Sequence, residues 1–335
     1  MTAELPLAEV PVPAKDAWRA KALRWTRAFL FFAGLGLAVW LVRSAGVANI
    51  LAILSDTWRW VPLLALLEVL FVSTDIVAIR VLLGDSAGQI GLSQWVRSTS
   101  AAYASTILLP AGRAAGEATR ATVLTPAVTA VRAIGASTRL QACFLAGNGV
   151  VSVFIVVAAA LRVGGGDLVV PVLLNALACG ALATALFSLL GSNRLASWLH
   201  RIAPRFAEAH QKSLGEAPSV SRLVRAASIC VCGRLLQTLL YAVALRAVGG
   251  TVTVSGAFVT QGAHLVGAAV GDLVPGQVGV TEGAYRAFAT TLGLAPARAL
   301  SIALLVRITQ LGLAMLCLLV FGVATLQGRA AEGRR

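Results

Sequence analysis

The chain is 335 residues long and carries 28 Lys and Arg against 14 Asp and Glu, a net charge of +14. Charged residues make up 13% of the chain, where a soluble domain has about 25%, and 58% of the residues are hydrophobic. This composition excludes a disordered chain and argues against a soluble enzyme. The basic residues are spread between long apolar runs, which argues against a nucleic-acid-binding protein. We therefore expect an integral membrane protein of the all-α class.

The choice of basic residues and the placement of the cysteines add to this expectation. Only Lys15, Lys21 and Lys212 are lysines and the other basic residues are Arg, which is typical of a GC-rich bacterial genome. Selection for Arg as a residue that holds phosphate with two parallel donors stays open as a second explanation. We expect a protein of the bacterial inner membrane. All five cysteines lie inside apolar runs, and none has the spacing or the His partners of a metal site. We expect no disulfide, metal or cofactor.

Six segments are apolar and long enough to cross a bilayer, which takes about 20 residues of helix. Basic residues precede the first segment, and basic loops stay in the cytoplasm, so residues 1–27 are expected to form a cytoplasmic N-terminal segment. The first span is expected to be a signal anchor rather than a cleaved signal peptide. The predicted spans are about 28–45, 61–83, 140–161, 168–190, 224–248 and 299–325.

The polar loops set the direction of each span. The linker 191–223 and the tail 326–335 are basic, so we expect both in the cytoplasm. Counting the predicted spans between these cytoplasmic segments then requires that residues 93–131 enter and leave the membrane from the cytoplasmic side. Residues 252–296 must enter and leave from the opposite side. Pro, Gly and charged residues interrupt both segments, so we predict two re-entrant helical hairpins within a transmembrane domain of residues 28–325. Both chain termini are then cytoplasmic.

The two hairpin segments resemble each other. The first reads Pro110-Ala-Gly-Arg-Ala-Ala-Gly-Glu117, with Arg120 three residues later. The second reads Pro275-Gly-Gln-Val-Gly-Val-Thr-Glu282, with Arg286 four residues later. Similar segments in opposite orientations predict an inverted repeat, in which about 61–161 corresponds to about 224–325. Paired segments interrupted by Gly and Pro indicate the binding site of a transporter.

These motifs also resemble a known family. The second is similar to the Pro-Gly-Gly-x-Gly-x-x-Glu signature of the lysylphosphatidylglycerol synthase transmembrane region, a flippase-like family, and the first resembles its Leu-Pro-x-x-x-Gly-Glu-x-x-Arg motif. The resemblance covers about residues 25–325. Gln277 stands where a second Gly is usual, the first motif has two additional residues before Gly116, and the acidic residue usual after Arg139 is absent. Members with synthase activity carry a soluble aminoacyl-transferase domain, which we expect to be absent.

The resemblance implies that the protein moves a phospholipid or lipid-linked headgroup between membrane leaflets. No Gly-Lys-Ser/Thr phosphate loop and no nucleophile with its base can be identified, so we expect neither an enzyme nor an ATP-driven motor. Transport is then downhill or ion-coupled, and Asp272 and Glu282 are the candidates for proton coupling. The expected partners are anionic membrane lipids and lipid-synthesis enzymes, and nucleic acid is not expected.

Ionisable side chains inside a membrane are costly, so each indicates a function. Arg113, Arg120 and Arg286 are expected to hold the headgroup phosphate, because Arg offers two parallel donors and a helix N-terminus favours an anion. For Glu117 and Glu282 two interpretations stay open, since they either hold an Arg in place or cap a helix. The predicted substrate-binding set is Arg113, Glu117, Arg120, Asp272, Pro275, Gly276, Gly279, Glu282 and Arg286.

Five further polar residues lie within predicted spans. Glu68 and Asp75 are seven residues apart on one face of a helix, and we expect them to pair with Arg234. Arg307 and Gln310 share a face of the last span. Structural pairing between helices explains these five as well as substrate contact does.

Two other functions remain open. A secondary transporter for a small hydrophilic solute would use the same inverted repeat and take up solute without moving lipid. An accessory membrane subunit of envelope lipid or glycan synthesis would tolerate neutral substitutions at Arg120 or Arg286.

Overall fold

The computed structural model describes residues 32–33, 35–163, 166–192, 211, 214–215, 217–272, 274 and 277–332. All regular elements in this part of the chain are helices, as the composition predicts. The N-terminal segment 1–27 lies outside the described residues, as do most of the linker 191–223 and the end of the tail 326–335.

Five helical segments of the described chain are long and apolar enough to cross a membrane. The predicted span 61–83 coincides with α3, Val61–Leu83, and the span 168–190 with α7, Val169–Leu190. The first predicted span, 28–45, begins outside the described residues, and its described part forms the shorter apolar helix Leu35–Ala45. A further helix, α2 (Val47–Thr57), leads into α3 through the short turn Trp58–Trp60.

Three helices begin before the apolar runs that predict them, two of them after a polar cap and the third at a proline. In α6 (Ala130–Val163) the Thr129 hydroxyl accepts a hydrogen bond from the Arg132 amide at 3.4 Å, ten residues before the predicted start. In α10 (Val220–Ala247) the Ser219 hydroxyl accepts a hydrogen bond from the Arg222 amide at 3.4 Å. In α14 (Pro296–Glu332) a proline occupies the first turn, where its missing N–H costs nothing.

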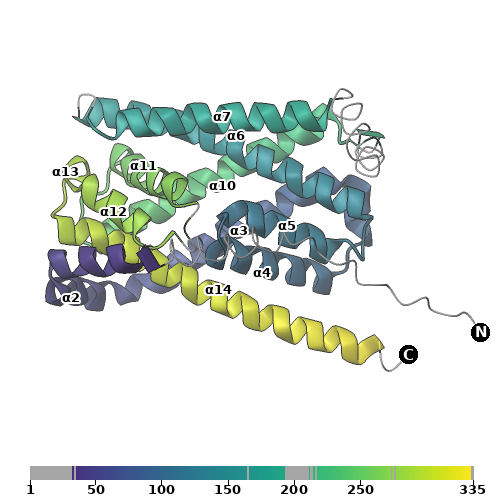
Figure 1. The fold of residues 1–335 in the computed structure, drawn as a ribbon, viewed down its shortest axis with the longest axis horizontal. Helices are drawn as coiled ribbons and strands as arrows, with labels where there is room; N and C mark the ends of the chain where they lie inside the picture. The colour runs from purple at the N-terminus through teal and green to yellow at the C-terminus, as the bar shows by residue number, and fades with distance from the viewer. Residues whose placement is uncertain are drawn as a thin grey trace, which may run out of the picture.

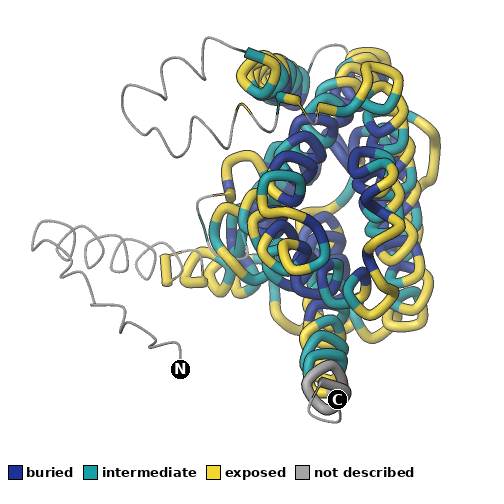
Figure 2. Tube along the Cα trace, turned by 90° about the vertical axis from the view of Figure 1, so that its right-hand side faces the viewer, coloured by how far each residue is buried: buried dark blue, intermediate teal, exposed yellow. Residues whose placement is uncertain are grey.

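The long helices run side by side along the longest axis of the molecule, with α6 and α7 forming one layer and α14 lying along the opposite side (Figure 1). Helix α10 packs against α3, α6 and α11 and so lies at the centre. Buried residues face the interior of the bundle, and exposed residues face outward (Figure 2). The outward face carries large apolar side chains such as Leu161, Leu174 and Leu319, as expected for a surface in contact with lipid.

The two predicted hairpin segments both fold as helix-turn-helix units. The first consists of α4 (Leu92–Leu108) and α5 (Gly112–Leu124), and the second of α11 (Val254–Gly271) and α12 (Val280–Ala287), followed by α13 (Ala289–Leu292). They approach from opposite ends of the bundle (Figure 1). Their turns meet, because the Ala111 amide donates a hydrogen bond of 2.9 Å to the Asp272 carbonyl.

One end of the bundle brings together the loops that the topology count places on one side. Asp85 and Ser86 after α3, Arg132 and Arg139 in the first turns of α6, and Arg222 near the start of α10 all line one polar cavity of about 350 Å³. Arg132 donates a hydrogen bond of 2.8 Å to the Ser86 hydroxyl. These loops therefore share one side of the molecule, as predicted.

Gly116 permits the close packing of α4 against α5. A Cβ at this position would lie 2.0 Å from the Thr106 hydroxyl and 2.8 Å from the Ala102 carbonyl oxygen, and the carbonyl belongs to the backbone and cannot rotate away. We expect Gly116→Ala to destabilise the protein by about 1–3 kcal/mol, the usual cost of overpacking. Thermal unfolding in detergent measures this effect.

Gly180→Ala is the matched control for that substitution. Gly180 also lies within a helix, α7, but a Cβ there meets no atom within 4 Å. The control should unfold at the wild-type temperature or slightly above it, because Ala is the better helix former. Equal effects of the two substitutions would contradict the packing role of Gly116.

Candidate functional site

A cavity of about 360 Å³ lies inside the bundle and reaches the turns of both hairpins. The helices that line it are α3, α4, α5, α6, α7, α10, α11 and α14. This volume lies in the range of small-ligand pockets. The spacing of seven between Glu68 and Asp75 does place both on the cavity face of α3, and Arg307 and Gln310 share the cavity face of α14. The predicted residues that line the cavity are Glu68, Asp75, Arg113, Glu117, Arg120, Arg234, Asp272, Arg307 and Gln310.

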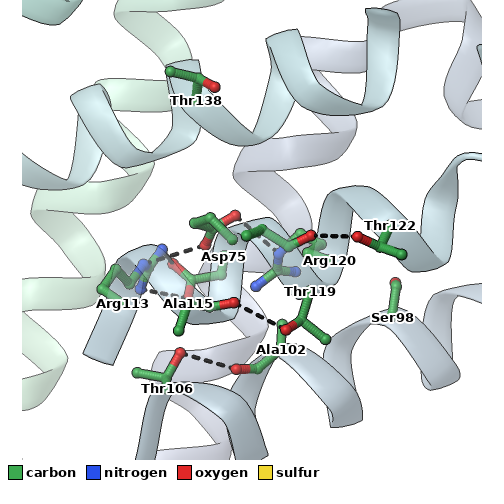
Figure 3. A network of polar contacts seen from close by, with 12 residues as sticks. Asp75, Ser98, Ala102, Thr106, Arg113, Ala115, Thr119, Arg120, Thr122 and Thr138 are labelled. Carbon is green, nitrogen blue, oxygen red and sulfur yellow. Dashed lines mark hydrogen bonds and ion pairs between the residues drawn. The ribbon is translucent and has the colours of Figure 1, made fainter. Parts of the chain in front are cut away.

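Arg113 is the centre of an ion-pair network on the first hairpin (Figure 3). Its two terminal nitrogens contact both oxygens of Asp75, Nη1 to Oδ2 at 2.8 Å and Nη2 to Oδ1 at 2.9 Å, and its Nε lies 3.2 Å from Glu117 Oε1. The other oxygen of Glu117 accepts a hydrogen bond of 3.1 Å from Arg120 Nε. Asp75 and Glu117 therefore compensate Arg113 and Arg120 in a largely buried place, and paired groups of this kind are costly to break.

Of the two interpretations of Glu117, the structure favours the one in which it holds an Arg. Helix α5 begins at Gly112, so Glu117 lies in the second turn, and its oxygens contact Arg113 and Arg120. The expectation that Glu117 stands at the start of a helix is wrong, because the helix begins two residues after Pro110 instead of near the glutamate.

Phe144 of α6 lies between two guanidinium groups. The centre of its ring is 3.8 Å from Cζ of Arg113 and 3.8 Å from Cζ of Arg234. The face of an aromatic ring carries negative potential, so one ring can hold a cation on each side. Phe144 thereby keeps two Arg side chains apart at the cavity wall and restricts the orientation of both.

The predicted pairing of Arg234 with Glu68 and Asp75 is wrong. Asp75 is engaged by Arg113, and no carboxylate of the described residues lies within 4.0 Å of the Arg234 guanidinium. Arg234 is 4% exposed, donates a hydrogen bond to the Gln237 side chain and stacks on Phe144. The stacking on Phe144 and the contact with Gln237 hold Arg234 in place without an anion.

Glu68 is held by neutral groups instead. Tyr103 and Gln310 both donate hydrogen bonds to its Oε1, at 3.1 and 3.2 Å. Its other oxygen has no hydrogen-bond partner among the described residues. The residue is 2% exposed, so this oxygen is buried at the cavity wall.

On the second hairpin, Glu282 fulfils both of the expected roles. Its Oε2 accepts a hydrogen bond of 2.7 Å from the Gly279 amide at the start of α12, and its Oε1 lies 3.5 Å from Arg307 Nε. Arg307 also donates a hydrogen bond of 3.2 Å to the Gln277 carbonyl. Helix α14 is thus tied to the turn of the second hairpin, and Glu282 lies behind the cavity wall rather than on it.

Gln277 adopts φ of 54°, a conformation that favours glycine. Its side-chain amide donates a hydrogen bond of 3.1 Å to Asp272 Oδ1. Asp272, a predicted candidate for proton coupling, has no cation within 4.0 Å among the described residues. It stands where the two hairpin turns meet.

Arg286 is not brought to the cavity. It donates hydrogen bonds to the Leu41 carbonyl and to the Ser44 hydroxyl, and its guanidinium lies 5.5 Å from the Trp40 ring, so it contacts the helix Leu35–Ala45. Pro275 and Gly276 lie outside the described residues, and Gly279 is the N-cap of α12 and does not line the cavity. The Arg residues that line the cavity are Arg113, Arg120, Arg234 and Arg307.

Sequence reasoning missed the roles of Phe144 and Tyr103. Both are aromatic residues within apolar or small-residue runs, so nothing in their types separates them from packing residues. Gln141 and Gln237 also line the cavity and were missed. Polar residues on the inward face of a span are the signal that identifies them, since such residues rarely face lipid. No group of three metal-ligating side chains occurs in the part of the chain that the structure describes.

An all-helical bundle with an apolar exterior, long apolar helices and a buried charged cavity defines a multi-pass membrane protein. The chain belongs to the family of the lysylphosphatidylglycerol synthase transmembrane region, whose model matches residues 26–318. Membership connects the protein with the modification or translocation of membrane lipids. Searches of curated proteins and of solved structures gave no match.

Proposed function

We propose that this protein moves the phosphodiester headgroup of a phospholipid or lipid-linked molecule between the leaflets of the bacterial inner membrane, and that it is not an enzyme. The observation that carries the proposal is a charged cavity buried among membrane-spanning helices, where the turns of two helical hairpins meet. A headgroup crossing hydrocarbon needs a polar path whose charges are compensated.

The arrangement supports an inverted repeat of two re-entrant hairpins that enter from opposite faces, with both termini in the cytoplasm. The hairpins approach each other from opposite ends of the bundle (Figure 1). The Ala111 amide donates a backbone hydrogen bond to the Asp272 carbonyl where their turns meet. Loosening of this junction from one side or the other would open the cavity to one leaflet at a time. The acyl chains would remain in the bilayer beside the apolar outer face.

Arg234 is the residue that we assign to the phosphate. Arg113, Arg120 and Arg307 already face carboxylates, whereas Arg234 faces the cavity without one among the described residues. A phosphodiester carries one negative charge and two free oxygens, which match the donors of one guanidinium. Arg113 and Arg120 then form part of the cavity wall, where Asp75 and Glu117 hold them in place.

Reconstitution in liposomes tests the proposal. The protein is inserted into vesicles with fluorescent phospholipid in both leaflets, and a membrane-impermeant reductant then measures the fraction that reaches the outer leaflet. We expect lipid movement well above that measured in protein-free vesicles. No movement of any phospholipid would overturn the proposal. Solute-driven currents without lipid movement would instead establish a solute transporter, which the cavity volume also accommodates.

A further inference from the structure

The cavity contains buried hydrogen-bond acceptors as well as a buried cation. Glu68 Oε2 and Gln141 Oε1 have no hydrogen-bond partner among the described residues, and both side chains line the cavity. Buried polar atoms are normally hydrogen-bonded, so each such atom requires an explanation. Asn148 Oδ1 also has no hydrogen-bond partner among the described residues and lines the same cavity, so these acceptors point to a ligand that brings its own donors.

The same cavity offers donors for an anion. Arg234 Nε and Arg120 Nη1 also have no hydrogen-bond partner among the described residues, and both residues are buried. A phosphodiester satisfies these donors but has no hydrogen of its own. It therefore leaves Glu68 and Gln141 without a partner, and the group attached to the phosphate must supply the missing donors.

We propose that the cavity selects phospholipids whose headgroup carries O–H or N–H donors, with the phosphodiester at Arg234 and the donors at Glu68 Oε2. This inference rests on the proposed function and names its substrate class. Hydroxyl and ammonium groups both fit, because each donates to a carboxylate oxygen. A headgroup that ends in methyl groups leaves buried acceptors unpaired and is rejected for that reason.

Four lipids with identical acyl chains separate the effect of donors from the effect of charge. Phosphatidylglycerol and phosphatidylmethanol both carry one negative charge, but only the first has hydroxyl donors. Phosphatidylethanolamine and phosphatidylcholine are both zwitterions, but only the first has ammonium donors. Binding of each lipid to the detergent-solubilised full chain is measured by native mass spectrometry, in competition with a common labelled lipid.

Within each pair we expect the lipid with donors to bind roughly tenfold tighter or more, the effect of one hydrogen bond to a charged group. Comparison of the two donor lipids shows whether a hydroxyl or an ammonium is preferred. Equal binding within both pairs, or affinities that follow net charge alone, would overturn the inference.

The substitution Glu68→Gln tests whether Glu68 Oε2 is the atom that produces the preference for donor-bearing headgroups. The substitution keeps the size of the side chain and one acceptor for Tyr103 and Gln310, but it replaces the free acceptor with a donor. We expect the difference within each pair to fall to about twofold or less, because the donors of the headgroup lose their acceptor. Asp85→Asn is the control, since Asp85 lies outside this cavity and its side chain is fully exposed.

The outcomes separate this inference from the function on which it rests. If Glu68→Gln keeps the full preference for donor-bearing lipids, the assignment of the headgroup donors to Glu68 Oε2 is overturned. If that variant fails to fold, binding of the four lipids to the wild-type protein still tests the selectivity. Selective binding without movement in liposomes would overturn the proposed function and leave the selectivity standing. Movement of all four lipids at equal rates would overturn the selectivity and leave the proposed function standing.

Discussion

Replacing Asp75 with Asn is expected to destabilise the folded protein by about 3–5 kcal/mol, the usual cost of removing one partner of a buried ion pair. Arg113 makes two contacts below 3.0 Å with the Asp75 carboxylate, and their side chains are 13% and 8% exposed. The Asn side chain offers one acceptor oxygen instead of two and carries no charge. Headgroup movement is expected to fall to the background rate, because Arg113 lines the cavity and contacts Phe144.

A second variant separates stability from function at this pair. Asp75→Leu combined with Arg113→Met removes both charges, and Glu117 keeps Arg120 as its partner. Its thermal stability in detergent is expected to return toward that of the wild-type protein, while movement of lipid in liposomes stays lost. Asp85→Asn, which breaks an exposed contact of 3.7 Å with Arg222, should change neither measurement. A wild-type unfolding temperature for Asp75→Asn would contradict the role of the pair.

Replacing Arg234 with Gln is expected to slow headgroup movement by about 10- to 100-fold, the loss of one or two charge-assisted hydrogen bonds to phosphate. Its thermal stability should change far less than that of Asp75→Asn. The reason is that no described carboxylate lies within 4.0 Å of Arg234, so its removal leaves no buried anion without a partner. The liposome assay and thermal unfolding in detergent measure the two effects.

Arg234→Lys is the informative control. Lys keeps the positive charge but loses the planar group that stacks on Phe144, and it offers no fixed pair of donors. We expect an intermediate rate of movement. A wild-type rate for Arg234→Gln would refute the assignment of this residue to the phosphate, and a stability loss as large as that of Asp75→Asn would show that Arg234 is a structural residue.

The membrane helices could be predicted from the sequence because apolar length is a strong and local signal. The limits of α3 were predicted without error, and the hairpin segments were recognised from their Pro, Gly and charged residues. The starts of α6 and α10 were less accurate. Thr129 and Ser219 cap these helices ahead of the predicted spans, and hydropathy does not show where a cap lies.

Part of the cavity lining was also predictable, because ionisable residues within spans rarely face lipid. The partners within the cavity were not. Whether Asp75 pairs with Arg113 or Arg234 depends on how α3, α5 and α10 are rotated against one another, and no short-range pattern encodes that rotation. Arg286 matches Arg120 in sequence, yet the position of the helix Leu35–Ala45 turns it to another partner.

Helix α14 is longer than the hydrocarbon layer is thick, so the geometry of the site depends on the thickness of the bilayer. Its apolar part, Pro296–Leu326, spans about 46 Å at 1.5 Å per residue, whereas the hydrocarbon layer is about 30 Å thick. The helix therefore tilts or carries its last turns out of the hydrocarbon. Arg307 and Gln310 lie on this helix and contact Glu282 and Glu68, so a change of tilt shifts the wall of the cavity. In the function that we propose, the acyl chains of the surrounding membrane would thus influence how tightly a headgroup is held.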